Sequence, residues 1–362
     1  MKILIIAWAR PNFMKISPII NEIKKHPAIE YKLIHTGQHY DKNMSDRFFE
    51  DLGLPYPDIN LNIHWWSVSE QIGHIMIAFD AVLLQEQPDY VLVVGDVNST
   101  VACWLTAKQH GVKVIHVEAW LRSFDMTMPE EINRIVVDRL SDLLFVSEKS
   151  GITNLLNEWK KEWVYLVWNV MIDCLIHNLD NIEKSTIMDT LHVEKDTYWV
   201  ITIHRPSNVD DPQTLTKIVD YFNKISEKIK LIIPIHPRTR KNLEWLGLLS
   251  NLESNKNLII TEPLGYLDFI KLVKNSKFVL TDSWWIQEET TLLQIPCLTM
   301  RENTERPITV EIGTSTLVGN DFIKIDLLIN DILEWKYKTW TIPEMWDWKA
   351  AERIFAFFLK RV

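Results

Sequence analysis

The sequence predicts an α/β protein built from two Rossmann-like, doubly wound domains. Short apolar runs alternate with amphipathic segments along the whole chain, and this alternation occurs in two successive series. Apolar strands joined by helical crossovers are typical of a parallel sheet covered on both faces. The chain has 362 residues, whereas single hydrophobic cores stop growing near ~250–300 residues. Two domains are therefore expected, with ligands bound in a cleft between the carboxyl ends of their strands.

The predicted strands are runs of four to six residues rich in Val, Ile and Leu. The first series comprises residues 2–7, 31–35, 90–94, 113–117, 143–146 and 164–167. The second series comprises residues 199–202, 230–235, 258–261, 278–281 and 296–299. Amphipathic helices are expected between them, for example over residues 14–25, 68–86 and 213–228. Strands that lack polar alternation are expected to be buried on both faces.

The break between the two series predicts the domain boundary. The first series ends near residue 169, and polar residues 177–196 precede the second. We therefore expect domains at 1–169 and 170–343. A last segment, 344–362, is expected to contain a helix, because apolar residues recur on one face of 349–362.

Bulk composition excludes several classes of function. The net charge of -9 supplies no basic stripe for a nucleic-acid backbone, so no nucleic-acid partner is expected. The apolar opening, residues 1–7, is too short for a membrane span, so no membrane partner is expected either. The three cysteines are far apart in the sequence and form no disulfide framework, which favours a reducing cytoplasm.

Tryptophan is abundant and glycine is scarce. The chain has 16 Trp and 10 Gly, whereas average glycine usage of about 7% would give roughly 25 glycines. The excess of one residue type matches the deficit of the other. This match indicates that tryptophan stands at positions suited to glycine, either through deliberate substitution or through natural divergence.

Charged residues follow several predicted strands of the first half. Arg10 and Lys15 belong to the loop and helix start after the first strand, a common phosphate site, although a solvated helix start fits equally. Asp96 and Glu118 end two other strands and are candidate acid/base groups; Asp96 also fits a helix N-cap. Glu131 lies one helical turn before an arginine and is a further candidate, with a surface ion pair as the alternative.

The second half places His and Arg residues at consecutive strand ends. His204 and Arg205 end one strand and His236 ends the next. These clusters favour an anionic group over a metal, since no metal-ligand spacing appears. Ser283 opens a predicted helix whose N-terminus could bind a diphosphate, and Glu289 could accept hydrogen bonds from a ribose. An N-capped helix with a solvated acidic face is the alternative for this segment.

Together these segments resemble the non-hydrolysing UDP-N-acetylglucosamine 2-epimerases. The resemblance extends from RPNFMK at residues 10–15 to AAERI at residues 350–354. It is carried by HTGQHYD at 35–41, GDVNST at 95–100, PEEINR at 129–134, HRPSN at 204–208 and RENTERP at 301–307. Agreement at all of these motifs is too specific for chance.

The resemblance implies two domains of the glycosyltransferase-B type, with the second binding UDP and the last helix packing back on the first. It implies interconversion of UDP-GlcNAc and UDP-ManNAc through loss and re-addition of UDP, without metal or cofactor. The implied acid/base and sugar-positioning residues are Asp96, Glu118, Glu131 and His204. The implied substrate-binding residues are Arg10, Lys15, Arg205, His236, Ser283, Glu289 and Arg306. Gln38 and His39 resemble a regulatory second UDP-GlcNAc site, and a cytoplasmic homodimer is expected.

The sequence departs from the family pattern where tryptophan replaces glycine. The clearest positions are Trp8, Trp120, Trp168, Trp284 and Trp285. Glycine allows positive φ and close approach of backbone to a phosphate, and an indole allows neither. Weakened UDP-GlcNAc binding is therefore expected. A hydrolysing epimerase, a glycosyltransferase of the same architecture and a non-catalytic protein of this fold are the alternatives.

Overall fold

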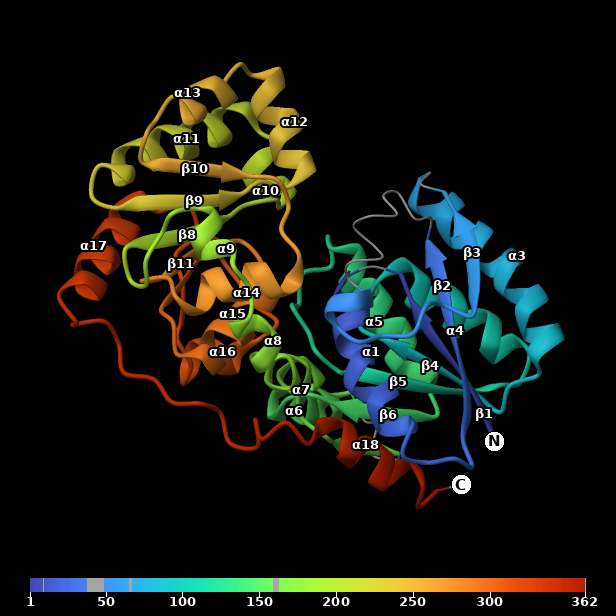
Figure 1. Ribbon diagram of the computed structural model, residues 1–362. Coiled ribbons are helices and arrows are strands. Elements are labelled where there is room, and N and C mark those ends of the chain that lie inside the picture. The colour runs from blue at the N-terminus through green and yellow to red at the C-terminus, as the bar shows by residue number, and fades with distance from the viewer. Residues whose placement is uncertain (9, 38–48, 65–66, 159–162, 362) are drawn as a thin grey trace. The chain divides into compact units, whose positions relative to one another are not determined.

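The computed structural model describes residues 1–8, 10–37, 49–64, 67–158 and 163–361. The chain forms two compact units, each with its own parallel sheet (Figure 1). Unit 1 comprises Met1–His177 and Met345–Val362, and unit 2 comprises Asn178–Glu344. The α/β class and the two Rossmann-like domains that the sequence predicts are confirmed.

Unit 1 contains a seven-stranded parallel sheet in the order β3-β2-β1-β4-β5-β6-β7. Its strands are β1 (Lys2–Ala7), β2 (Glu30–Gly37), β3 (Ile59–Ile63), β4 (Tyr90–Val94), β5 (Lys113–Ala119), β6 (Leu143–Val146) and β7 (Val164–Leu166). The order reverses direction at β1, so the carboxyl ends of β1 and β4 form a topological switch point. Ligands of such sheets bind at this point.

Helices cover both faces of this sheet. They are α1 (Arg10–Ile23), α3 (Val68–Glu86), α4 (Asn98–Gln109), α5 (Pro129–Leu140), α6 (Lys149–Asn157), α7 (Val170–His177) and α18 (Ala350–Phe358). Helix α4 packs between α3 and α5, whereas α1 packs against α7 and α18. Apolar residues of β1, β2, β4 and β5 form one core with α3, α4 and α5. The last helix is thus part of unit 1 although it follows unit 2 in the chain.

Unit 2 contains a six-stranded parallel sheet in the order β10-β9-β8-β11-β12-β13. Its strands are β8 (Tyr198–Thr202), β9 (Lys230–Pro234), β10 (Leu258–Thr261), β11 (Val279–Thr281), β12 (Cys297–Thr299) and β13 (Ser315–Leu317). The order reverses between β8 and β11. The carboxyl ends of these two strands form the corresponding switch point.

The helices of unit 2 also lie on two faces. They are α8 (Leu179–Glu183), α9 (Ile187–Thr190), α10 (Pro206–Val209), α11 (Pro212–Ser226), α12 (Pro237–Trp245), α13 (Leu249–Glu253), α14 (Tyr266–Lys274), α15 (Trp284–Leu293), α16 (Pro307–Glu311) and α17 (Phe322–Leu333). One core joins the sheet to α11, α12, α13 and α17. A second core joins its other face to α9, α14 and α15.

All eleven predicted strands are present, but the structure adds β3 and β13. Strand β3 alternates apolar and Asn side chains and is only partly buried. Strand β13 is three residues long and carries Ser and Thr. Neither has the continuous apolar run that identifies a central strand. Among the described residues, no helix is long and apolar enough to cross a membrane.

Tryptophan occupies left-handed backbone positions. Of the thirteen non-glycine residues with positive φ in the described ranges, five are tryptophan. They are Trp120 (φ 66°), Trp163 (φ 63°), Trp168 (φ 71°), Trp335 (φ 59°) and Trp348 (φ 54°). A left-handed backbone costs a residue with a Cβ ~1–2 kcal/mol. These positions therefore favour glycine, as the composition suggests.

Candidate active site

In unit 1, a buried ion pair joins helix α1 to the carboxyl end of β5. Lys15 on α1 contacts the Glu118 carboxylate through its Nζ, and both side chains are less than 10% exposed. A Cβ on Gly95, at the end of β4, would lie 2.9 Å from this Nζ, so glycine permits the close approach. Gly95 also has a φ of +66°. The strand ends thus bring a lysine and a carboxylate together at the switch point.

A second group of charged residues lies beside the carboxyl end of β4. Arg134 on α5 donates from Nε and Nη2 to Oδ2 of Asp96, at 2.9 and 2.6 Å. Its Nη1 donates to Oε2 of Glu131 at 2.6 Å. Asn133 donates to the Asp96 carbonyl at 2.8 Å. The helix that follows Asp96 is capped by Val97, so Asp96 is not the helix N-cap considered as an alternative.

Glu131 is held from its other side by a backbone turn. Its Oε2 accepts from the Ser123 amide at 2.9 Å and from Ser123 Oγ at 3.1 Å, and its Oε1 accepts from the Phe124 amide at 3.1 Å. Glu131 is 1% exposed. Three carboxylates are therefore fixed in unit 1 by one lysine, one arginine and backbone amides. Positioned carboxylates of this kind can act in proton transfer.

In unit 2, His204 follows β8 and contacts Asp282, which follows β11. His204 Nδ1 lies 3.1 Å from Asp282 Oδ1. Asp282 also accepts from the Arg205 amide at 2.9 Å and from Asn208 Nδ2 at 3.0 Å. Burial opposes ionisation of Asp282, but His204 and these donors lower its pKa below the ordinary value. The carboxylate therefore orients His204 and the start of α10.

His236 lies beside His204, with ring centroids 5.3 Å apart. Its Nδ1 accepts from the Arg238 amide at 3.1 Å and caps α12. The other ring nitrogen, Nε2, therefore carries the proton when the ring is neutral. Two imidazoles and Arg205 are gathered at consecutive strand ends, a suitable arrangement for an anionic group.

The N-terminus of α15 carries a buried indole instead of an open turn. Ser283 is the N-cap and makes no side-chain capping bond in the described structure. Trp284 is 3% exposed. The guanidinium groups of Arg205 and Arg301 lie 4.7 and 3.9 Å from its ring centroid. Two cations that could face an anion thus stack on tryptophan.

Two adjacent glutamates on α15 have opposite environments. Glu288 Oε1 forms an ion pair with Arg306 Nε at 2.6 Å, and both side chains are buried. Burial raises the pKa of Glu289 to about 8 from the ordinary 4.5. Glu289 is therefore mostly protonated at neutral pH, whereas the charge of Arg306 is balanced by Glu288.

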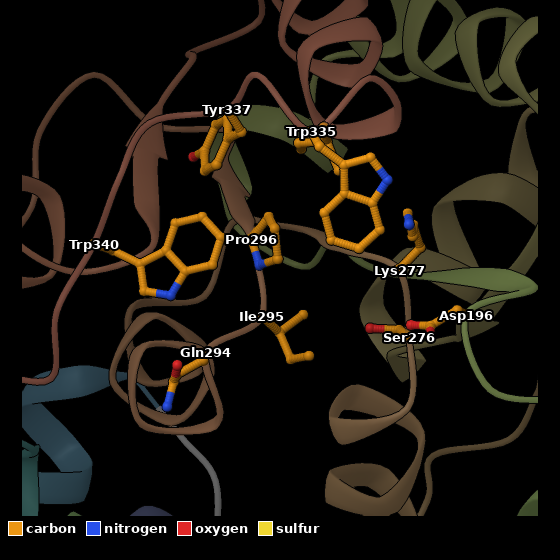
Figure 2. Close-up of a pocket in the computed structure, with 10 residues that line it drawn as sticks. Asp196, Ser276, Lys277, Gln294, Ile295, Pro296, Trp335, Tyr337 and Trp340 are labelled. Carbon is orange, nitrogen blue, oxygen red and sulfur yellow. The ribbon is translucent and has the colours of Figure 1, made fainter.

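A pocket of about 160 Å³ lies at the opposite, amino-terminal edge of the unit 2 sheet. It is lined by Asp196, Ser276, Lys277, Gln294, Ile295, Pro296, Ile332, Trp335, Tyr337 and Trp340 (Figure 2). Asp196, Lys277 and Pro296 precede β8, β11 and β12 respectively. Because ligands of parallel sheets bind at the carboxyl ends, this pocket lies away from the candidate site.

Comparison with known proteins identifies the family. Residues 21–359 match the family described as UDP-N-acetylglucosamine 2-epimerase. The UDP-N-acetylglucosamine 2-epimerase of Methanocaldococcus jannaschii is 42% identical over 360 residues, covering 98% of both proteins. The chain belongs to the UDP-N-acetylglucosamine 2-epimerase family.

Two further comparisons refine this assignment. The crystal structure of the M. jannaschii UDP-GlcNAc 2-epimerase in complex with UDP-GlcNAc and UDP aligns with a TM-score of 0.92, covering 99% of this chain and 100% of that chain at 42% identity. The UDP-2,3-diacetamido-2,3-dideoxy-D-glucuronate 2-epimerase of Pseudomonas aeruginosa is 41% identical over 323 residues, covering 88% of both proteins. Family membership therefore leaves two sugar substrates to distinguish.

Most predicted epimerase residues lie in the two groups described above. Asp96, Glu118, Glu131 and Lys15 are in unit 1, whereas His204, Arg205, His236, Ser283, Glu289 and Arg306 are in unit 2. Within unit 1, Lys15 pairs with Glu118. The side chain of Arg10 and residues Gln38 and His39 lie outside the part that the structure describes. In the described ranges, no group of three or more His, Cys, Asp or Glu side chains could hold a metal ion.

Sequence reasoning missed four buried residues that organise the epimerase site. They are His116, Asp138, Asp282 and Glu288. Asp282 and Glu288 directly precede the predicted site residues Ser283 and Glu289, but only the contacts to His204 and Arg306 reveal what they do. His116 lies within the apolar run of β5, and Asp138 is near the end of α5. A polar residue in an otherwise apolar strand is the signal that could have found His116.

Three other predicted departures, Trp8, Trp120 and Trp168, lie in unit 1. The indole of Trp8 packs against Gly37, where an added Cβ would lie 2.6 Å from its Cδ1. Trp120, next but one to Glu118, is fully buried, and its indole N–H has no hydrogen-bond acceptor within the described part. Trp168 is 5% exposed. Each indole fills space that a glycine would leave open.

Proposed function

We propose that this protein catalyses the interconversion of UDP-GlcNAc and UDP-ManNAc. The observation that carries the proposal is the group of three fixed carboxylates in unit 1, Asp96 and Glu118 at strand ends and Glu131 on α5. The chain that holds them is 42% identical to an archaeal UDP-N-acetylglucosamine 2-epimerase. A proton bound to carbon needs a base held in position, and carboxylates paired with Lys15 and Arg134 cannot rotate freely.

The proposed reaction is an elimination followed by an addition. A carboxylate of unit 1 takes the proton from C2 of the sugar. The electrons of the C2–H bond form a C1=C2 double bond while the C1–O bond breaks, so UDP leaves as an anion with the oxygen electrons. Protonation of C2 on the opposite face, with return of the UDP oxygen to C1, gives the epimer. Asp96, Glu118 and Glu131 are the candidate acid/base groups.

Unit 2 supplies charge for the leaving group in this proposal. His204, His236 and Arg205 can stabilise the UDP anion, and Ser283 with the α15 N-terminus can donate to a diphosphate. Glu289 can hydrogen-bond a ribose hydroxyl. The role of Arg306 is to hold Glu288 and the loop around it, since its charge is already balanced there.

We further propose that Trp284 and Trp285 weaken UDP binding. The guanidinium groups of Arg205 and Arg301 lie over the indole of Trp284 and would otherwise be available to the diphosphate. Replacement of both tryptophans by glycine should tighten UDP binding at least tenfold in calorimetry. Trp245→Gly, at an exposed helix end, is the control and should leave the Kd unchanged. Micromolar UDP binding by the unaltered chain would contradict this part of the proposal.

A second candidate substrate is UDP-2,3-diacetamido-2,3-dideoxy-D-glucuronate, because the relative that acts on it is 41% identical. That sugar carries a carboxylate, so it would require an additional cation. Each nucleotide sugar should be offered separately to the Trp284→Gly/Trp285→Gly variant. We expect epimerisation of UDP-GlcNAc, and turnover of the uronate alone would reassign the substrate. Accumulation of free UDP with ManNAc would instead identify a hydrolysing enzyme.

A cytoplasmic homodimer is the proposed state of the protein. The three cysteines are all free and buried, which is compatible with a reducing compartment. Light scattering in solution should give twice the chain mass, and a monomer would contradict the assembly.

The regulatory role of Gln38 and His39 remains a prediction, to be tested by adding UDP-GlcNAc to assays of UDP-ManNAc epimerisation.

A further inference from the structure

A buried histidine–aspartate pair lies beneath the strand ends that carry Asp96 and Glu118. His116 on β5 and Asp138 on α5 are both fully buried. His116 Nδ1 lies 2.8 Å from Asp138 Oδ1, and His116 Nε2 lies 2.9 Å from the Gly95 carbonyl oxygen. We propose that this pair is a positioning unit for epimerisation, which holds the Asp96 and Glu118 strand ends in register; the proposal rests on the function proposed above.

The hydrogen bonds define the orientation of the pair. The Gly95 carbonyl can only accept, so His116 Nε2 donates to it. Asp138 Oδ2 accepts from the Trp120 amide at 3.0 Å and from Arg122 Nη1 at 2.7 Å. Asp138 Oδ1 is left to bond His116 Nδ1. Both ring nitrogens are therefore hydrogen-bonded, which fixes the ring in one orientation.

One end of the pair controls the residue before Asp96. Gly95 has a left-handed φ of +66°, a conformation that glycine adopts without cost but does not prefer. The bond from His116 selects one orientation of its carbonyl. Since Asp96 follows directly and its own carbonyl is bonded to Asn133, the peptide on each side of Asp96 has a defined partner.

The other end controls the backbone around Glu118. Glu118 has a φ of +70°, which costs a non-glycine residue ~1–2 kcal/mol. The pairing of β5 with β6 shifts register between Val117 and Ala119, so Glu118 lies in a bulge. Asp138 binds the side chain of His116 and the amide of Trp120, two residues before and two residues after Glu118. One carboxylate thus fixes both sides of the bulge that presents Glu118.

Two matched variants of His116 test its bond to Gly95 and its bond to Asp138 separately. His116→Gln can keep a donor near the Gly95 carbonyl, whereas His116→Asn can keep a donor toward Asp138, and neither can bond both partners. Both should be made in the full chain carrying Trp284→Gly and Trp285→Gly. We expect each to lower kcat about tenfold or more, with KM changed less than about twofold and the Kd for UDP unchanged. His110→Asn is the control, because His110 pairs with the partly exposed Asp80 at 2.6 Å.

An unchanged kcat in both His116 variants would overturn the proposal. A parallel loss of kcat and UDP binding would also overturn it, because that result indicates general unfolding. A measurement without substrate distinguishes failure of this inference from failure of the proposed function. In nitrogen-15 NMR of the histidine rings, His116 Nε2 should carry a slowly exchanging proton, because it donates to the buried Gly95 carbonyl. Rapid exchange of that proton, or an Nε2 without a proton, would contradict the assigned hydrogen bond even if the enzyme epimerises UDP-GlcNAc.

Discussion

Lys15 and Glu118 form a buried ion pair between the first helix and the fifth strand of unit 1. The two residues are far apart in the sequence, and the parallel sheet brings them together at its switch point. The pair gives the buried Glu118 a fixed charge partner. A carboxylate held in one position is suited to removal of a proton from carbon.

Substitution of Glu118 or Lys15 should lower the rate of catalysis without changing UDP binding. Glu118→Gln should reduce C2 proton exchange by ~10²–10⁴-fold, because the amide cannot act as a base. Lys15→Met removes the ion pair that holds Glu118 in position and should lower the rate. Glu130→Gln, one position before Glu131 on α5, is the control. An equal rate for Glu118→Gln and the parent would assign the base to another residue.

Where a tryptophan has a left-handed backbone, the glycine variant should be more stable than the alanine variant. Trp348 has a φ of 54° and is 50% exposed, whereas Trp245 ends α12 and is 76% exposed. At position 348, glycine should be more stable than alanine by ~1 kcal/mol, because only alanine keeps the left-handed penalty. At position 245, glycine should be less stable than alanine by ~0.5–1 kcal/mol. Urea denaturation of the four variants measures both differences.

The same order of stability at both positions would contradict the assignment of position 348 as a glycine site.

The origin of the tryptophans can be tested on the protein from its source cells. If the tryptophans arose by substitution, the protein isolated from its source cells should contain glycine at positions 120, 168, 284, 285 and 348. Peptide mass spectrometry distinguishes this from natural divergence, which predicts tryptophan in the same peptides.

Replacement of Glu289 by Gln should stabilise the fold, whereas the same replacement at the adjacent Glu288 should destabilise it. Burial raises the pKa of Glu289 to about 8 from the ordinary 4.5, so the folded state retains a proton that the unfolded state loses between these values. Its contribution to stability therefore falls as pH rises through this window. Glu289→Gln should gain stability over the parent between pH 5 and pH 9, by about a few kcal/mol.

Glu288→Gln is the matched comparison for that variant. It removes the charge that balances the buried Arg306, so it should destabilise the fold by as much as ~3–5 kcal/mol. Thermal unfolding at pH 5, 7 and 9 measures both variants. A Glu289→Gln variant whose stability relative to the parent does not change with pH would contradict the raised pKa.

Asp173 should control the attachment of the last helix. Its carboxylate accepts from the Ala350 and Ala351 amides at 3.2 and 2.8 Å and thereby caps α18. Asp173→Ala should destabilise unit 1 by ~1–2 kcal/mol and accelerate hydrogen exchange at these amides. Asp347→Ala removes a partly exposed ion pair with Arg353 and should cost less than ~1 kcal/mol. Equal exchange in Asp173→Ala and the parent would contradict the capping role.

Burial also raises the pKa of Asp173, to about 6 from 3.8. Between these values the folded state binds a proton that the unfolded state has released. The contribution of Asp173 to stability therefore decreases from about pH 4 to about pH 6 and is constant above that window. This decrease should be absent in Asp173→Ala.

The sequence predicted the parts of the fold that follow from continuous apolar runs. The central strands β1, β4 and β8 are buried along nearly their whole length, so their sequences carry a clear signal. Strands β3 and β13 lie at sheet edges, where partial exposure permits Asn, Ser and Thr. No run of apolar residues distinguishes such strands from loops.

The same reasoning explains which site residues could be found. Asp96, Glu118 and His204 follow apolar strands directly, and residues at that place in a parallel sheet face the ligand edge. Asp138 and Asp282 act through hydrogen bonds to other residues, so their roles depend on distances between segments far apart in the chain. Such pairings are set by tertiary packing and have no local sequence pattern.

Deuterium incorporation at C2 of UDP-GlcNAc in D₂O tests the central claim most directly. The claim is that the fixed carboxylates of unit 1 exchange the C2 proton while UDP departs and returns. For the chain with glycine at positions 8, 120, 168, 284 and 285, we predict deuterium at C2 in both UDP-GlcNAc and UDP-ManNAc, and its loss in Glu118→Gln. UDP binding by that chain without deuterium at C2 of either sugar would contradict the account.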